Sequence, residues 1–202
     1  MSRVEQTIDV DVPVRVAYDQ WTQFEEFPEF MEAVQRVTQQ DDQMLEWEAK
    51  VAGQTRTWTA KIVDQTPDTR IAWKSVEGTE NAGAVVFESL GSDKTRLKVT
   101  IDADPQGVIE NIGDAIGLLD HQVKGDLDRF KTFIESRHDA TGAWRGEIHG
   151  DAVTRDARAE TTGNPSEAAS GESQGDAVRA ASDDVQPDSG DSIHQVDDRP
   201  GI

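Results

Sequence analysis

The 202-residue chain contains no cysteine. Disulfide bonds, thiolate nucleophiles and cysteine-ligated metal sites are therefore excluded. Histidine is scarce as well, and the four histidines show no spacing that is typical of metal ligands; they are His121, His138, His149 and His194. We therefore expect neither a metal site nor a bound cofactor.

Long apolar runs are also missing. No stretch approaches the length that is needed to cross a membrane. The first residues, 1–6, lack the apolar region of a secretion signal and lead directly into an alternating strand pattern. We expect a cytoplasmic protein without an integral membrane segment.

Basic residues are few, with 20 Lys and Arg against 40 Asp and Glu, for a formal net charge of −20. Such an excess of negative charge repels DNA, RNA and anionic membrane surfaces at long range. We therefore expect no nucleic-acid partner. Both a high-salt cytosol and an ordinary acidic bacterial protein fit this charge.

Large apolar residues become sparse after residue 139, where they are scattered without period among Asp, Glu, Ser, Gly and Thr. Burial of so few apolar side chains does not offset the entropy of ordering the chain. We predict a single domain, a Trp-containing linker segment and an acidic disordered tail, at residues 1–139, 140–150 and 151–202. Trp144 and Ile148 of the linker are spaced i, i+4, which fits packing on the domain, docking on a protein partner, or an incidental tryptophan.

The residues from Val12 to Met31 predict two short helices. Pro13 suits the first turn of a helix, and the apolar residues after it follow helical spacing at Val14, Ala17, Tyr18 and Trp21. Pro28 disfavours helical dihedrals at Phe27, so the segment should break there and resume as a second helix that buries Phe30 and Met31.

Alternating patterns predict a strand at residues 4–10, a weaker one at 34–38, and a hairpin around Ala52-Gly53. A two-residue loop at Ala52-Gly53 places Trp47 directly opposite Trp58. In the same way, a two-residue loop at Pro67-Asp68 places Ile62 opposite Trp73. Three tryptophans therefore point to one side of the sheet.

Two further strands are predicted at residues 83–90 and 95–102, with Val85 and Phe87 inward on the first. From Asp104-Pro105 onward, apolar residues keep helical spacing for seven turns. A sheet with one apolar face needs a cover, and this terminal helix can supply it. The predicted fold is α+β, with a curved antiparallel sheet wrapped around a long C-terminal helix and two short helices after the first strand.

Several segments resemble the polyketide cyclase/dehydrase and coenzyme-Q-binding branch of the START-like (SRPBCC) superfamily, over roughly residues 3–138. The resemblance is carried by residues 10–18 (VDVPVRVAY), 24–31 (FEEFPEFM), 83–87 (GAVVF), 95–97 (TRL) and the final helix. It implies the helix-grip fold, which is also that of the Bet v 1-like proteins. It also implies an apolar cavity between helix and sheet for a lipid, quinone, sterol or polyketide.

The tryptophans Trp47, Trp58 and Trp73 either line such a cavity or fill it. Arg56 either binds an oxygen of a ligand at the cavity mouth or lies near a strand end with its head in water. His121 lies opposite the apolar stripe and should face solvent. The candidate pocket residues are Tyr18, Trp47, Arg56, Trp58, Trp73, Ser75, Val85, Phe87 and Ile116.

Three functions fit these patterns. The first is binding or carriage of a small hydrophobic molecule. The second is a cyclase or dehydratase in which Tyr18 or Arg56 polarises a carbonyl. The third is an interaction protein with a closed core, in which the acidic tail binds a protein partner. No base poised beside a nucleophile is apparent, so catalytic residues are not assigned.

Overall fold

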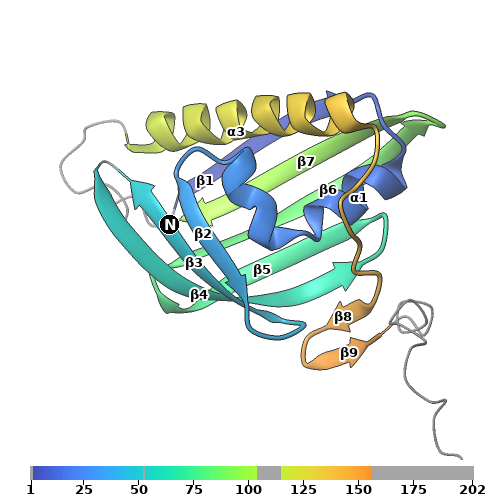
Figure 1. The fold of residues 1–202 in the computed structure, drawn as a ribbon. Helices are drawn as coiled ribbons and strands as arrows, with labels where there is room; N and C mark the ends of the chain where they lie inside the picture. The colour runs from blue at the N-terminus through green and yellow to red at the C-terminus, as the bar shows by residue number, and fades with distance from the viewer. Residues whose placement is uncertain (1, 52, 104–114, 156–202) are drawn as a thin grey trace, which may run out of the picture. The chain divides into compact units, whose positions relative to one another are not determined.

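The computed structural model describes residues 2–51, 53–103 and 115–155. Within these ranges the chain forms one antiparallel sheet, two short helical segments and a long helix, α3 (Figure 1). The strands are β1 (Ser2–Val10), β2 (Val34–Gln39), β3 (Met44–Val51), β4 (Gln54–Thr66), β5 (Arg70–Gly78), β6 (Asn81–Gly91), β7 (Lys94–Ala103), β8 (Glu147–His149) and β9 (Ala152–Thr154). The helical segments are α1 (Val14–Trp21), the 3₁₀ helix η1 (Phe24–Glu29) and α3 (Ala115–Arg137).

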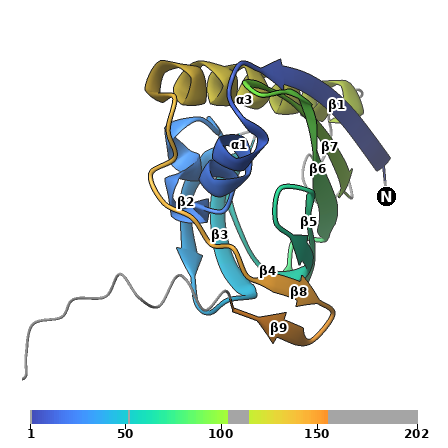
Figure 2. The same ribbon diagram turned by 90° about the vertical axis from the view of Figure 1, so that its right-hand side faces the viewer.

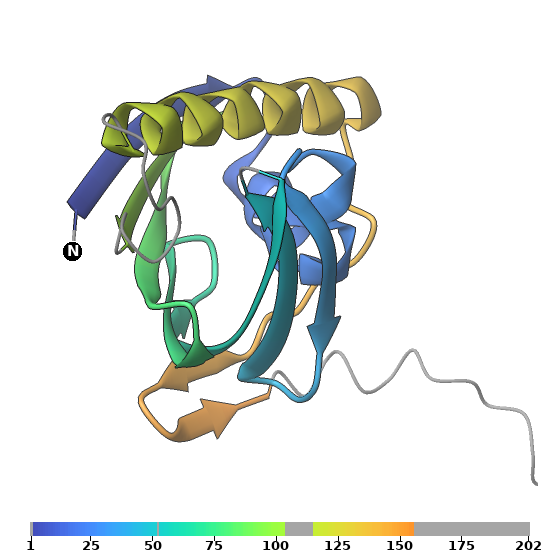
Figure 3. The same cartoon turned by 90° about the vertical axis from the view of Figure 1, so that its left-hand side faces the viewer.

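The order of the main strands across the sheet is β1-β7-β6-β5-β4-β3-β2. The sheet curves so that β6 and β7 stand on one side and β2 and β3 on the other, with α3 across the open side (Figures 2 and 3). This is the predicted α+β helix-grip arrangement. The part of the predicted terminal helix before Ala115 lies outside the described residues.

The predicted tryptophan pairing is confirmed, because Trp47 lies opposite Trp58 and Ile62 opposite Trp73. The loop after β4 is nevertheless longer than the predicted two residues, since Thr66 pairs with Arg70. A bulge at Val63 absorbs the extra residue, which restores the predicted register at Ile62.

The first helix begins as predicted, with Pro13 immediately before α1. The predicted break at Phe27-Pro28 is wrong. The chain leaves α1 at Thr22, and η1 then runs through Pro28, whose fixed φ also suits a 3₁₀ helix. Phe30 is buried, as expected, but it follows η1 instead of belonging to a helix.

The compact unit that contains the described residues continues past residue 139. Strand β8 pairs with β4 and with β9, and Ile148 is fully buried. We call residues 140–155 the C-terminal segment. Of the three alternatives considered for Trp144 and Ile148, the structure shows packing on the domain. The prediction of a disordered tail from residue 151 is wrong for residues 151–155, which include β9. The rest of the predicted tail, residues 156–202, lies outside the described residues.

Candidate functional site

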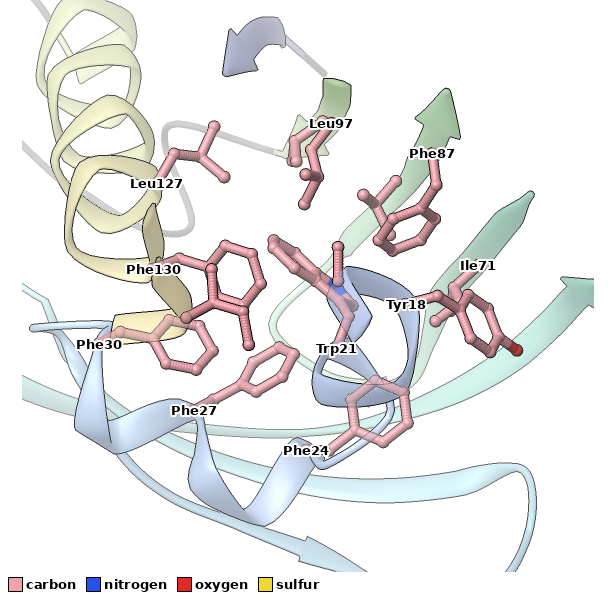
Figure 4. Close-up of a cluster of buried hydrophobic side chains, with 14 of the residues drawn as sticks. Tyr18, Trp21, Phe24, Phe27, Phe30, Ile71, Phe87, Leu97, Leu127 and Phe130 are labelled. Carbon is pink, nitrogen blue, oxygen red and sulfur yellow. The ribbon is translucent and has the colours of Figure 1, made fainter. Parts of the chain in front are cut away.

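An aromatic cluster joins α1, η1 and α3 (Figure 4). The Trp21 ring centroid lies 4.9 Å from that of Phe130 in an edge-to-face arrangement, and 5.6 Å from that of Phe27. Phe30 lies 5.1 Å from Phe130 and completes the group. These large, mutually packed rings fix how α3 sits over the short helices.

A cavity of about 190 Å³ lies beside this cluster, between the concave face of the sheet and α3. Its volume is several times the share of one water molecule, about 30 Å³ in the liquid. Most of its lining is apolar: Trp21, Phe24, Phe27 and Met31 near the short helices, Leu45, Trp47, Trp58, Ile62, Trp73, Val99 and Ile101 on the sheet, and Leu119, Val123 and Leu127 on α3. The polar lining residues are Arg56, Thr79, Asn81, Gln122 and Asp126.

The three sheet tryptophans stand on this concave face. The Trp47 and Trp58 rings are stacked, with centroids 5.7 Å apart and planes inclined by 7°. Trp73 lies over Gly83 of the neighbouring strand, so closely that a Cβ there would stand 2.5 Å from the Trp73 ring. Glycine at position 83 therefore lets the Trp73 ring approach the sheet closely, and Trp73 lines the cavity.

Four of the nine candidate residues line the cavity, namely Trp47, Arg56, Trp58 and Trp73. The tryptophans thus border an open space that they do not fill. Alternation within two successive hairpins was enough to find them, because all four belong to β3, β4 and β5 and share one face.

Tyr18, Val85 and Phe87 are buried outside the cavity lining. The Tyr18 ring meets Phe87 edge-on at 5.5 Å, and its hydroxyl oxygen accepts a hydrogen bond of 3.0 Å from the Gln65 amide. Burial raises the pKa of Tyr18. The interpretation of these residues as pocket lining does not match their positions. Asn81 at the start of β6 lines the cavity, whereas Val85 and Phe87 lie further along that strand, where Phe87 packs on Tyr18 of α1 (Figure 4).

Ser75 and Ile116 also lie outside the lining. The Ser75 hydroxyl accepts a hydrogen bond of 3.0 Å from the backbone N–H of Asn81, beside a bulge at Val76 that interrupts the β5 pattern. Ile116 is 47% exposed in the first turn of the described part of α3. The buried residues of the apolar stripe begin later in the helix, at Val123. His121 is exposed, as predicted.

Asp126 and Gln122 are lining residues that the sequence patterns did not reveal. Each directly precedes a buried residue of the apolar stripe on α3, Leu127 or Val123. A position next to this stripe is the feature of the sequence that could have indicated them as lining residues. The Asp126 carboxylate accepts hydrogen bonds from the Glu32 backbone N–H at 3.1 Å and from Arg129. Burial nevertheless raises the pKa of Asp126.

A polar cluster holds the C-terminal segment on the other side of α1. Arg145 forms a bidentate pair with Asp68, at 3.0 and 2.7 Å, and also donates to Asp19 at 2.6 Å. The Trp144 backbone N–H donates to the Thr22 hydroxyl at 3.0 Å. These bonds join the segment to α1 and to the β4–β5 turn.

In the described part of the chain, no three or more His, Asp or Glu side chains are grouped so that they could hold a metal ion. None of the helices in those ranges is both long and apolar enough to cross a membrane.

Comparisons with known proteins agree with this geometry. A family model described as polyketide cyclase / dehydrase and lipid transport matches residues 10–132. An uncharacterized 17.2 kDa protein of Streptomyces lincolnensis is 47% identical over 149 residues, which cover 73% of this chain and 99% of that protein.

Two solved structures share the fold. A START superfamily protein from Mycobacterium smegmatis has a TM-score of 0.53 at 17% identity, covering 67% of this chain and 95% of that one. The Zhui aromatase/cyclase from Streptomyces sp. R1128 has a TM-score of 0.56 at 18% identity, covering 70% and 98%. The fold is therefore START-like, and the chain belongs to the polyketide cyclase / dehydrase and lipid transport family.

Proposed function

We propose that this protein binds and carries a small hydrophobic molecule in the cavity between the sheet and α3. The observation that carries the proposal is the cavity of about 190 Å³ with its mainly apolar lining. Transfer of apolar surface from water into such a space is favourable by roughly 25 cal/mol per Å². The lining also comes from rigid elements, so the space is largely formed before a ligand enters.

The position of Tyr18 favours binding over the cyclase alternative. The cyclase alternative requires Tyr18 or Arg56 to polarise a carbonyl of the substrate. Tyr18 lies in the core, where its hydroxyl oxygen accepts a hydrogen bond from the Gln65 amide. No pair of acid and base side chains is evident among the described lining residues. The ligand therefore gains its affinity mainly from apolar contact.

Adjacent leucines on α3 provide a matched test. Leu119 lines the cavity, whereas Leu118 is 46% exposed on the same helical turn. Leu119→Trp should fill the cavity, while Leu118→Trp adds the same bulk toward solvent. Binding of 2-methylnaphthalene is measured by isothermal titration calorimetry, and the purified protein is examined for a co-purifying apolar molecule by native mass spectrometry.

We expect the wild-type protein and Leu118→Trp to bind 2-methylnaphthalene with equal affinity, and Leu119→Trp to bind at least about tenfold more weakly. A folded wild-type protein that binds no apolar probe would overturn the proposal. Equal binding by the folded Leu119→Trp variant would also overturn it, since the ligand would then lie elsewhere.

A further inference from the structure

Two hydrogen-bond donors in the cavity lining are unpaired. The Nε1 atom of Trp47 and the Nε atom of Arg56 are buried, and neither has a hydrogen-bond partner within the described residues. Both side chains line the cavity. Buried N–H groups in proteins nearly always have a partner, so a pair of unpaired donors at one cavity requires an explanation.

The two donors belong to neighbouring positions on one face of the sheet. Trp47 pairs with Trp58 and Ala49 pairs with Arg56, so Arg56 occupies the position diagonal to Trp47. Diagonal neighbours on one sheet face are about 7–8 Å apart at their backbones, which long side chains can span. A single oxygen-bearing group on a ligand can therefore meet both side chains.

Both side chains are held by other contacts. The Trp47 ring is stacked on Trp58 and meets Phe27 edge-on, with centroids 5.6 Å apart. The Nη2 atom of Arg56 donates to the Gln54 side-chain oxygen at 2.9 Å, which leaves its Nε unpaired. Donors held in place in this way lose little entropy when an acceptor binds.

The acidic residue of the lining does not compete for these donors. The Asp126 carboxylate already accepts from the Glu32 backbone N–H and from Arg129. An apolar ligand without an acceptor would leave the two buried donors unpaired. A ligand with an acceptor would supply the partner that they lack.

We infer that the ligand carries a carbonyl or carboxylate oxygen, and that Arg56 and Trp47 orient it by donating hydrogen bonds to that oxygen. This inference rests on the proposed function and goes beyond it by naming the polar group of the ligand. It makes Arg56 and Trp47 determinants of specificity, while the apolar lining supplies affinity that is common to all ligands of suitable size.

Three probes of similar shape separate the inference from the proposed function: 2-methylnaphthalene, 2-acetylnaphthalene and 2-naphthoate. The wild-type protein should bind the ketone or the carboxylate at least about tenfold more tightly than the hydrocarbon. A stronger preference for the carboxylate would identify the ligand group as charged, and a stronger preference for the ketone as neutral. Equal affinities for all three probes would overturn the inference and leave the proposed function intact. Absence of binding by all three would overturn both.

Variants then assign the preference to the two donors. Arg56→Met and Trp47→Phe each remove one donor, and each should reduce severalfold the ratio of ketone or carboxylate affinity to 2-methylnaphthalene affinity. Arg36→Met serves as the matched control, because Arg36 is exposed and pairs with Glu48. The indole N–H resonance of Trp47, assigned by its loss in Trp47→Phe, should move downfield with the ketone or the carboxylate. Retention of the full preference in both folded variants, or an unmoved indole resonance, would overturn the inference.

Discussion

Trp47 stacks on Trp58 across β3 and β4, with ring centroids 5.7 Å apart and planes only 7° from parallel. The pair borders the cavity and forms a flat apolar surface on the concave face of the sheet. Offset stacking of this kind adds about 0.5–1.5 kcal/mol beyond the area that the rings bury. The two tryptophans therefore stabilise the β3–β4 hairpin as well as shaping the cavity.

A double-mutant cycle measures this coupling. Trp47→Leu, Trp58→Leu and the double variant should each lower the free energy of unfolding, and the coupling between the two sites should be about 1 kcal/mol. Urea denaturation of the four proteins gives the value. If the two single losses add to within about 0.3 kcal/mol, the stacked rings do not stabilise one another.

Two glycines should respond oppositely to alanine. At Gly83 a Cβ would stand 2.5 Å from the Trp73 ring and 2.7 Å from the Thr100 carbonyl oxygen, so Gly83→Ala should lower stability by about 1–3 kcal/mol. At Gly125 in α3 the nearest atom would be the flexible end of Arg129 at 3.4 Å. Gly125→Ala should raise stability by up to about 1 kcal/mol through helix propensity. Thermal or urea unfolding tests both, and equal losses would contradict the close packing of Trp73 on Gly83.

Arg145 should dominate the attachment of the C-terminal segment. Its side chain is only 18% exposed and pairs with Asp19 and Asp68. Arg145→Met therefore removes the bidentate partner of Asp68 and leaves Asp19 with the more exposed Arg15, at 3.5 Å. We expect a loss of about 1.5–3 kcal/mol in unfolding free energy, together with faster amide exchange at Ile148. Arg155→Met removes an exposed arginine that pairs with Asp42 and should cost no more than about 1 kcal/mol. Unchanged exchange at Ile148 in Arg145→Met would show that apolar packing alone holds the segment.

The burial of Asp126 should appear in the pH dependence of stability. Because its pKa is raised in the folded protein, the folded state binds a proton more tightly than the unfolded state, whose aspartate pKa is about 3.9. The Asp126 contribution to stability should therefore fall as pH rises from about 3.9 through the raised pKa, and remain level above it.

Asp126→Asn removes this contribution. The difference in unfolding free energy between the wild-type protein and Asp126→Asn should decrease with rising pH in that window, while contributions from other carboxyl groups cancel. An NMR titration of the Asp126 side-chain carbon gives the folded-state pKa directly. A midpoint at or below the ordinary aspartate value would contradict the assigned effect of burial.

Much of the sheet followed from local patterns. Alternation in two neighbouring segments was sufficient to pair Trp47 with Trp58, because the side-chain period of a strand is two and a short loop sets the register. The pairing of Ile62 with Trp73 was also correct, although the bulge at Val63 and the longer turn had to compensate each other. Local patterns do not reveal bulges, since an extra residue is accommodated by the partner strand.

The C-terminal segment shows where composition misleads. Its polar character predicted a linker, yet the buried side chain of Ile148 and the ion pairs of Arg145 attach it to the domain. A few long-range contacts were enough to order this short segment, and their partners Asp19 and Asp68 lie far away in the sequence. Composition gives the number of apolar residues in a segment, but it does not show hydrogen bonds and ion pairs to residues far away in the sequence.

The sequence by itself determined the fold class, the shared face of Trp47, Arg56, Trp58 and Trp73, and the absence of cysteine chemistry. Only the tertiary structure decided that these side chains border an open space, and that Tyr18 of α1 and Phe87 of β6 pack against each other outside it. The physical reason is that periodicity identifies the buried face of an element. Which element covers that face, and how completely its side chains fill the space, depends on packing between residues distant in the chain.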